Sequence, residues 1–252
     1  MRRLYPHASE DVDLAQEYAF PAFSHQPWVR AVFVASADGA ATVEGRSGGL
    51  GSGTDHRLFA LLRGLADVVL VGAETVRTER YGPVRSHPAW RDERAGRPPT
   101  PPLAVVSRRL DFDISSSLFS RAPGHARTII ITCEAAPPQR LRALGDAADV
   151  IIAGDRQVDL TGAVNALAER GHLRISCEGG PRLFAQVVGA GLLDELCLTL
   201  SPLLLAGGST RITNGSLIPG GLALQLAGVL EDGGYLFLRY TCPPGPTHPA
   251  AQ

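Results

Sequence analysis

The chain has 252 residues, of which 44% are hydrophobic and 19% charged, and its formal net charge is −1. This composition predicts a soluble globular protein with a sizeable core, and the near-zero charge provides no general attraction to nucleic acid or to an anionic membrane. All 24 basic residues are arginine, which excludes a Schiff-base lysine and the lysine of a P-loop. Any phosphate is therefore expected to be bound by arginine side chains or by the backbone.

The four cysteines lie far apart and the seven histidines are scattered, so no spacing typical of metal ligands occurs. We expect no metal site, and we expect the cysteines to be reduced core residues, as is usual in the cytosol. The first six residues, Met1 to Pro6, lack the apolar core of a signal peptide, and no uncharged apolar run reaches membrane-spanning length. These features predict a cytoplasmic protein whose partners are neither nucleic acid nor membrane.

The first part of the chain is the least regular. Residues 1–28 show no clear period, so we interpret them as an N-terminal extension with at most a short helix at 12–18. The first clear strand covers 29–36, and Asp38 with Gly39 predicts a tight turn, after which 40–43 is a candidate return strand. Asp38 can be a turn former or a pocket residue. The glycine-rich stretch 45–53 is compatible with a lid, a phosphate cradle or simple flexibility.

Helices and strands alternate in the middle of the chain. Ser52 and Asp55 form a capping-box pattern that opens a helix with leucines at 58, 61, 62 and 65 on one face. Residues 86–102 are rich in arginine and proline and predict a surface loop. The remaining expected elements are strands at 67–72, 103–107, 127–132 and 150–153, and helices at 137–144 and 159–170.

The most informative stretch is Cys177-Glu178-Gly179-Gly180-Pro181. It follows a buried strand at 173–177 and precedes a helix and a second strand at 194–201. Two glycines let the backbone approach a ligand closely, and proline suits the first position of a helix, whose free N–H groups favour an anion. Glu178 is either a ligand-binding group at the carboxyl end of the strand or a partner for a nearby arginine or N–H.

This order of elements predicts one α/β domain at 29–240, with a mostly parallel mixed sheet flanked by helices. The last two strands, 222–230 and 235–240, should form an antiparallel hairpin that joins this sheet or pairs with a second subunit. Residues 241–252 are expected to be a disordered tail.

Three segments occur in an order that goes beyond these general patterns. They are Ser36-Ala37-Asp38-Gly39, then Gly72-Ala73-Glu74-Thr75-Val76-Arg77, then Glu178-Gly179-Gly180-Pro181 running into Leu193-Asp194-Glu195-Leu196. Together they resemble the reductase domain of bacterial riboflavin biosynthesis proteins, which has the dihydrofolate-reductase-like fold, over about residues 29–240. The elements of the zinc deaminase domain that often precedes this reductase are missing. The resemblance therefore implies a stand-alone reductase.

The resemblance implies an enzyme that takes a hydride from NADPH and reduces the ribosyl group of a pyrimidine ribosylamine phosphate to a ribityl chain. Its candidate catalytic residues are Glu178 and Asp38. The positions that match substrate-binding residues of the family are Arg63, Glu79, Arg85 and Glu178. Those that match cofactor-binding positions are Val34, Thr75, Glu79, Ser107, Gly179, Gly180 and Pro181. By the same similarity we expect a homodimer.

Three residues depart from the pattern of the family. Val32 stands where bacterial members often carry a lysine, Ala37 replaces a leucine, and Leu50 stands where an aromatic residue often follows the glycine loop. These departures keep two alternatives open: a reductase of dihydrofolate or another pterin on the same fold, and an NADPH-binding module without catalysis. No residue is an obvious proton donor, so water and Glu178 both remain candidates.

Overall fold

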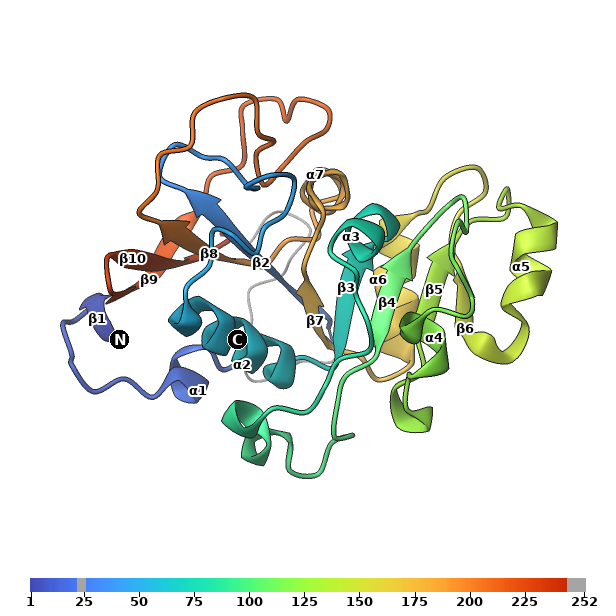
Figure 1. Ribbon diagram of the computed structural model, residues 1–252, viewed down its shortest axis with the longest axis horizontal. Helices are drawn as coiled ribbons and strands as arrows, with labels where there is room; N and C mark the ends of the chain where they lie inside the picture. The colour runs from blue at the N-terminus through green and yellow to red at the C-terminus, as the bar shows by residue number, and fades with distance from the viewer. Residues whose placement is uncertain (22–25, 244–252) are drawn as a thin grey trace.

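The computed structural model describes residues 1–21 and 26–243 of the chain (Figure 1). Within these residues ten strands form one sheet in the order β1-β9-β10-β8-β2-β7-β3-β4-β5-β6. The strands are β1 (Arg2–Tyr5), β2 (Trp28–Ser36), β3 (Val68–Gly72), β4 (Leu103–Val106), β5 (Ile129–Thr132), β6 (Asp149–Ile152), β7 (Arg174–Cys177), β8 (Glu195–Ser201), β9 (Gln225–Asp232) and β10 (Tyr235–Thr241).

The seven strands from β8 to β6 run parallel, and β10, β9 and β1 continue the sheet antiparallel at one side. The predicted fold class, a mostly parallel mixed sheet with a C-terminal antiparallel hairpin, is confirmed. Because parallel strands end at the same edge, the residues that follow β2, β3, β4 and β7 meet there.

Helices cover both faces of the sheet (Figure 1). They are α1 (Leu14–Glu17), α2 (Gly53–Leu65), α3 (Ala73–Thr78), α4 (Ser117–Ser120), α5 (Pro138–Leu144), α6 (Leu160–Glu169) and α7 (Pro181–Gly189), with short 3₁₀ helices at Pro88–Trp90, Asp92–Arg94, Gly124–Ala126 and Gly145–Ala147. Val69 and Val71 of β3 pack in the cluster that contains α2, whereas Val68 and Leu70 pack in the cluster that contains α6 and α7. Successive side chains of the buried strands point to opposite faces of the sheet, so they form two cores, one on each face.

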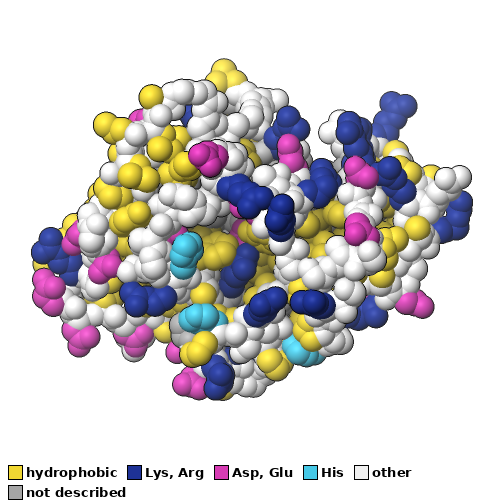
Figure 2. All heavy atoms as spheres, in the orientation of Figure 1, with side chains coloured by type: hydrophobic (Ala, Val, Ile, Leu, Met, Phe, Trp, Pro, Cys, Tyr) yellow, Lys and Arg dark blue, Asp and Glu magenta, His cyan; other side chains and the backbone are white. Residues whose placement is uncertain are grey.

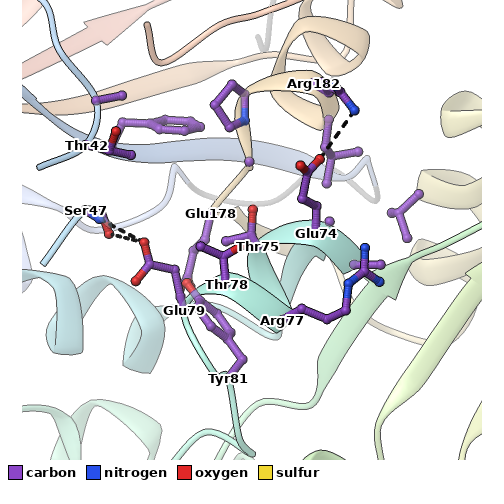
Figure 3. A pocket seen from close by; sticks show the side chains of 18 of the residues that line it. Thr42, Ser47, Glu74, Thr75, Arg77, Thr78, Glu79, Tyr81, Glu178 and Arg182 are labelled. Carbon is purple, nitrogen blue, oxygen red and sulfur yellow. Dashed lines mark hydrogen bonds and ion pairs between the residues drawn. The ribbon is translucent and has the colours of Figure 1, made fainter. Parts of the chain in front are cut away.

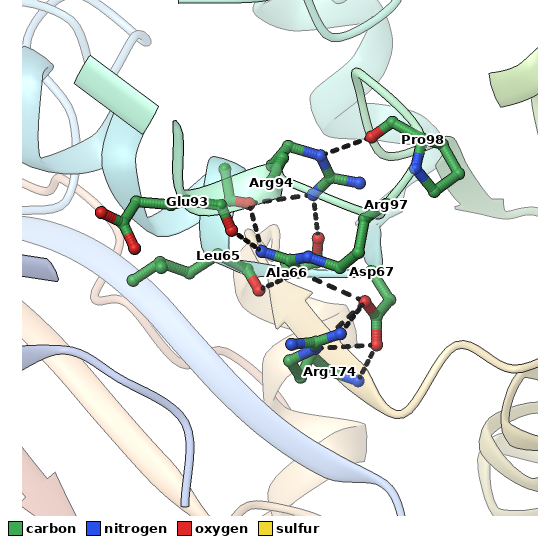
Figure 4. Close-up of polar contacts among 9 residues, drawn as sticks. Leu65, Ala66, Asp67, Glu93, Arg94, Arg97, Pro98 and Arg174 are labelled. Carbon is green, nitrogen blue, oxygen red and sulfur yellow. Dashed lines mark hydrogen bonds and ion pairs between the residues drawn. The ribbon is translucent and has the colours of Figure 1, made fainter. Parts of the chain in front are cut away.

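Helix α2 is fixed at both ends. Ser52 accepts a hydrogen bond from the backbone N–H of Asp55 at the start, and the four leucines expected on the inner face are buried. At its end, Arg94 donates to the carbonyl oxygens of Gly64 (2.9 Å) and Ala66 (2.5 Å), and Arg97 donates to that of Leu65 (2.9 Å) (Figure 4). The predicted surface loop at 86–102 is therefore partly buried, because its arginines neutralise the carbonyl end of α2.

Two expectations for the first part of the chain are corrected. Residues 40–43 do not form a return strand: the N–H of Ala41 donates to the carbonyl of Thr210, so the chain crosses to a distant loop after the turn. The N-terminal extension contributes β1, which pairs with β9 through Arg2 and Glu231. This strand has four residues with a mostly exposed surface, so it lacks the apolar alternation that marks a strand in sequence.

The terminal hairpin lies antiparallel in the sheet, with β10 between β8 and β9. Since β1 covers the outer edge of β9, the hairpin joins the sheet of its own chain and this edge needs no second subunit to cover it. The predicted disorder at 241–252 falls mostly outside the described residues.

Candidate functional site

A cavity of about 1020 Å³ opens at the carboxyl edge of the parallel strands. Its walls come from β2, the glycine-rich loop, α2, the start of α3, the residues after β4 and the start of α7. Arginine side chains gather around the hollow in the middle of this face (Figure 2). The location is the one where open α/β sheets bind ligands.

The Gly-Gly turn closes one wall of this cavity. The carbonyl of Gly179 accepts a hydrogen bond from the N–H of Gly72 at 2.6 Å, and this ties the end of β7 to the end of β3. Gly179 has φ +76°, and its peptide bond to Gly180 is cis. A Cβ on Gly180 would lie 2.5 Å from Oγ1 of Thr75, so a side chain at this position requires a shift between this helix start and α3.

Helix α7 begins with Pro181, and Gly180 before it provides no side-chain cap. The first N–H groups of a helix have no partner within the helix and carry partial positive charge. Gly180, Pro181 and Thr75 line the cavity. An anion is favoured at such a wall.

Arg63, Glu178 and Tyr81 form a buried polar cluster at the inner end of the cavity. Arg63 of α2 donates from Nε and Nη2 to the two carboxylate oxygens of Glu178, both at 2.6 Å, and the hydroxyl of Tyr81 donates to Oε2 at 2.7 Å. The side chain of Glu178 is 2% exposed and that of Arg63 is 23% exposed. The parallel geometry of two N–H groups on one carboxylate is the strongest form of this interaction.

Electrostatics keeps Arg63 charged and Tyr81 neutral in this cluster. Burial lowers the pKa of the Arg63 guanidinium, but the Glu178 carboxylate outweighs this effect and the net pKa is raised. Burial, together with the same carboxylate, raises the pKa of the Tyr81 hydroxyl. Tyr81 therefore stays a neutral donor to Oε2 of Glu178, and Arg63 donates to both carboxylate oxygens.

Glu79 ties the glycine-rich loop to α3. Its carboxylate accepts hydrogen bonds from the backbone N–H of Ser47 (2.8 Å) and from the Ser47 hydroxyl (3.1 Å) (Figure 3). Glu79 and Ser47 both line the cavity. These hydrogen bonds fix the glycine-rich loop as one wall of the cavity in this structure. They argue against simple flexibility, one of the three interpretations that its composition left open.

The remaining predicted site residues divide into two groups. Val34 and Ser107 line the cavity, and Ser107 also accepts a hydrogen bond from the N–H of Leu110. Asp38 and Arg85 do not line it: Asp38 accepts hydrogen bonds from the N–H groups of Leu205 and Ala206, and Arg85 is exposed. These contacts favour the interpretation of Asp38 as a turn former.

Several cavity residues were not anticipated as site residues. Four are arginines that line the cavity: Arg77, Arg108, Arg109 and Arg182. The first donates to the carbonyl of Asp111, and the last forms an ion pair with Glu74 at 3.5 Å (Figure 3). The signal in sequence was the position of Arg108 and Arg109 directly after a buried strand. Asp55 also lines the cavity. Its place in a helix-capping pattern gave no indication of this in the sequence.

Two absences apply to the described part of the chain. No group of three or more His, Cys, Asp or Glu in residues 1–21 and 26–243 could hold a metal ion. No helix in the same ranges is long and apolar enough to cross a membrane.

A mostly parallel sheet flanked by helices, with a cavity at its carboxyl edge, places the chain in the class of α/β proteins that bind ligands at this edge. Within this class the assignment is specific: residues 27–238 match the sequence model of the RibD C-terminal domain, so the chain belongs to this family. The resemblance found in the sequence is confirmed.

Relatives agree with this assignment. A pyrimidine reductase-like protein from Corynebacterium diphtheriae has a similar structure, with a TM-score of 0.80, 33% identity, and coverage of 91% of this chain and 98% of that one. The 2,5-diamino-6-ribosylamino-4(3H)-pyrimidinone 5′-phosphate reductase of Archaeoglobus fulgidus is 26% identical over 185 residues, which cover 72% of this chain and 83% of the relative. Riboflavin biosynthesis reductase Rib7 of Saccharomyces cerevisiae shares the fold, with a TM-score of 0.68, 16% identity, and coverage of 91% and 97% of the two chains.

Proposed function

We propose that the protein is an NADPH-dependent reductase of riboflavin biosynthesis, which reduces the ribosyl group of a ribosylaminopyrimidine 5′-phosphate to a ribityl chain. The observation that carries this proposal is the cavity itself, since one hollow holds both the Gly-Gly helix start and the Arg63–Glu178 pair. Such a hollow can accept a dinucleotide and a second, sugar-bearing ligand side by side. The reductases among the relatives support the same chemistry.

The two ligands occupy different walls in this proposal. The start of α7 at Gly180 and the hydroxyl of Thr75 bind the cofactor pyrophosphate, and the backbone at Val34 lies beside the nicotinamide. Arg63 and Glu178 form the wall for the phosphate and sugar of the substrate; Glu178 takes Nε and Nη2 of Arg63, which leaves Nη1 to meet the ligand. The bound cofactor supplies a hydride, and the chain orients the acceptor carbon toward it.

The choice of NADPH over NADH rests on the arginines after β4. The additional 2′-phosphate of NADPH is commonly accommodated by a nearby arginine, and Arg108 and Arg109 line the cavity at the end of a strand. In the Arg108→Ala/Arg109→Ala double variant we expect the Kd for NADPH to rise about tenfold or more, with that for NADH nearly unchanged. Fluorescence titration of both cofactors measures this difference.

Arg121→Ala is a matched control for this experiment, because Arg121 is an exposed arginine that does not line the cavity. It should leave both affinities unchanged. An equal loss of NADPH and NADH binding in the double variant would show that these arginines do not read the 2′-phosphate, and NADPH would lose its support over NADH.

The decisive experiment follows NADPH oxidation by absorbance, with the ribosylaminopyrimidine phosphate and dihydrofolate offered in parallel. Turnover of the first substrate alone establishes the proposed function. Turnover of dihydrofolate alone moves the function to pterin reduction. Bound NADPH with no turnover of either substrate identifies a binding module, and the proposal then fails.

We also propose that the protein is a homodimer and works in the cytoplasm. Two exposed leucines on the segment that follows β8 support the dimer, since Leu204 is 81% and Leu217 is 89% exposed. Four free cysteines, three of them buried, fit a reducing compartment. We expect sedimentation velocity at micromolar protein to show a dimer, and a monomer under these conditions would contradict the assembly.

A further inference from the structure

Helix α2 presents three side chains to the cavity at intervals of four residues: Asp55, Phe59 and Arg63. Residues four apart lie on one face of a helix, and eight residues span about 12 Å. The ring of Phe59 lies 4.3 Å from the Arg63 guanidinium. This face therefore has the Arg63–Glu178 pair at one end and a second carboxyl group, that of Asp55, at the other.

Asp55 lies over the pair of strands β2 and β8. Asp55 and Thr199 line the same small hollow, and Thr199 is the register partner of Val34. Val32 and Asp55 line the main cavity and also a small hollow beneath it, which Thr199 lines too. Asp55 is thus placed next to the strand position that the proposed function assigns to the nicotinamide.

The carboxyl group of Asp55 differs from that of Glu178 in its partners. Within the described residues, Glu178 has an ion pair with an arginine and Asp55 has none. Burial raises the pKa of Asp55, and the Thr199 hydrogen bond and the charge of His56 oppose this only in part. A carboxyl group in this environment can carry a proton under conditions in which a solvated aspartate is ionised.

The other titratable groups around Asp55 do not compete with it as proton donors. Tyr18 and Cys197 line the small hollow with it, and burial raises the pKa of both the Tyr18 hydroxyl and the Cys197 thiol, so both stay neutral. His56 is its neighbour on α2. Across the main cavity the charges of Arg63 and Glu178 satisfy each other.

Asp55 makes one of the two hydrogen bonds that a purely structural, helix-capping role would use. In a full capping box, the side chain of the third helical residue accepts a hydrogen bond from the backbone N–H of the capping residue. Here the N–H of Asp55 donates to the Ser52 hydroxyl at 3.1 Å, but the reverse bond does not occur among the described hydrogen bonds. Asp55 instead lines the cavity and the small hollow that Thr199 also lines.

We propose that Asp55 is the proton donor of the reaction, a role that rests on the proposed function. The C1′ carbon of the substrate receives a hydride, the C1′–O4′ bond of the ribose breaks, and its electron pair stays on O4′. The proton of Asp55 joins O4′ and forms the 4′-hydroxyl of the ribityl chain. The carboxylate left behind regains a proton from solvent through the open cavity, so each cycle consumes one hydride and one proton.

The test is Asp55→Asn, which preserves size and the contact with Thr199 but removes the acid. We expect kcat to fall about 100-fold or more, the usual contribution of a general acid, with the Kd for NADPH within about twofold of wild type. The wild-type rate should fall at high pH, where Asp55 loses its proton, and this basic limb should be absent from the residual activity of the variant. Asp92→Asn, an exposed carboxylate away from the cavity, should match the wild type.

A second variant separates catalysis from support of the helix. Thr199→Val keeps the shape of the side chain and removes a hydrogen bond that lowers the pKa of Asp55. Its basic limb should therefore move to higher pH, which a merely structural role of Asp55 does not predict.

Cofactor-free protein provides an independent readout. The folded pKa of Asp55 is raised, so the folded state binds more protons than the unfolded state between the two pKa values. Stability from this group is therefore lost as pH rises through that window, and the loss persists above it. Asp55→Asn should abolish this loss, so its Tm relative to wild type should increase with pH.

The outcomes distinguish a failure of the Asp55 assignment from a failure of the proposed function. Wild-type turnover with unchanged kcat in Asp55→Asn, or with an unchanged basic limb, overturns the role of Asp55 and leaves the proposed function standing. NADPH binding without turnover by the wild type overturns both together. A large loss of kcat with intact NADPH binding and a lost basic limb supports the assignment.

Discussion

Arg63→Ala is expected to lower the free energy of unfolding by about 3 kcal/mol, because it leaves a buried carboxylate without its cation. The side chain of Glu178 is 2% exposed, and among the described residues it keeps the Tyr81 hydroxyl as its one side-chain donor in this variant. Arg63 itself is 23% exposed, so water can reach the vacated space, and the loss should lie at the lower end of the range for buried pairs. The KM for the phosphorylated substrate should rise about tenfold or more.

Urea unfolding and steady-state kinetics measure the two effects separately. Arg57→Ala is the matched control, because Arg57 lies on the same helix, is exposed, and donates a hydrogen bond to the Thr54 hydroxyl. It should change the free energy of unfolding by less than about 0.5 kcal/mol. A loss of stability as small as this in Arg63→Ala would mean that the pair with Glu178 does not hold α2 against the sheet.

Arg85 provides a contrast to Arg63, since both match substrate-binding positions of the family. Arg85 is exposed and does not line the cavity, so Arg85→Ala should leave the free energy of unfolding unchanged. An increase in KM for the phosphorylated substrate would assign it a role at the entrance. An unchanged KM would limit phosphate recognition to the cavity itself.

The sequence predicted those parts of the site that depend on local order. The turn at Glu178-Gly179-Gly180-Pro181 could be predicted because a buried strand, two glycines and a helix-starting proline are neighbours in the chain. The pairing of Glu178 with Arg63 could not, since 115 positions separate them and only the sheet order brings β7 next to β3 and α2. The local pattern indicates that an arginine is one of many candidate partners for Glu178, and tertiary packing determines that the partner is Arg63.

The same reason explains the errors in the fold. Buried parallel strands are apolar runs that the sequence displays directly, whereas β1 is short and mostly exposed and is held by pairing with β9. The arginine-rich stretch 86–102 has the composition of a loop, yet Arg94 is 4% exposed, because the carbonyl end of α2 provides its acceptors. Such residues are buried by distant partners, and composition alone does not reveal them.

Gly180→Ala is expected to weaken NADPH binding by about tenfold to a hundredfold, which is about 1.4 to 2.7 kcal/mol. Its φ is −70°, a value that any residue adopts, so the effect is steric and not conformational. The new methyl group would lie 2.5 Å from Oγ1 of Thr75, and one of them must move into the space proposed for the pyrophosphate. Fluorescence titration with NADPH measures the loss, and thermal unfolding checks that the variant remains folded.

Gly189→Ala is the control, because it lies in the same helix, where a Cβ meets nothing within 4 Å. Alanine favours a helix over glycine by up to about 1 kcal/mol, so this variant should bind NADPH normally and be at least as stable as the wild type. Wild-type affinity in a folded Gly180→Ala variant would place the pyrophosphate elsewhere. The two cavity walls would then exchange roles, and the Arg63–Glu178 end would have to accommodate the cofactor.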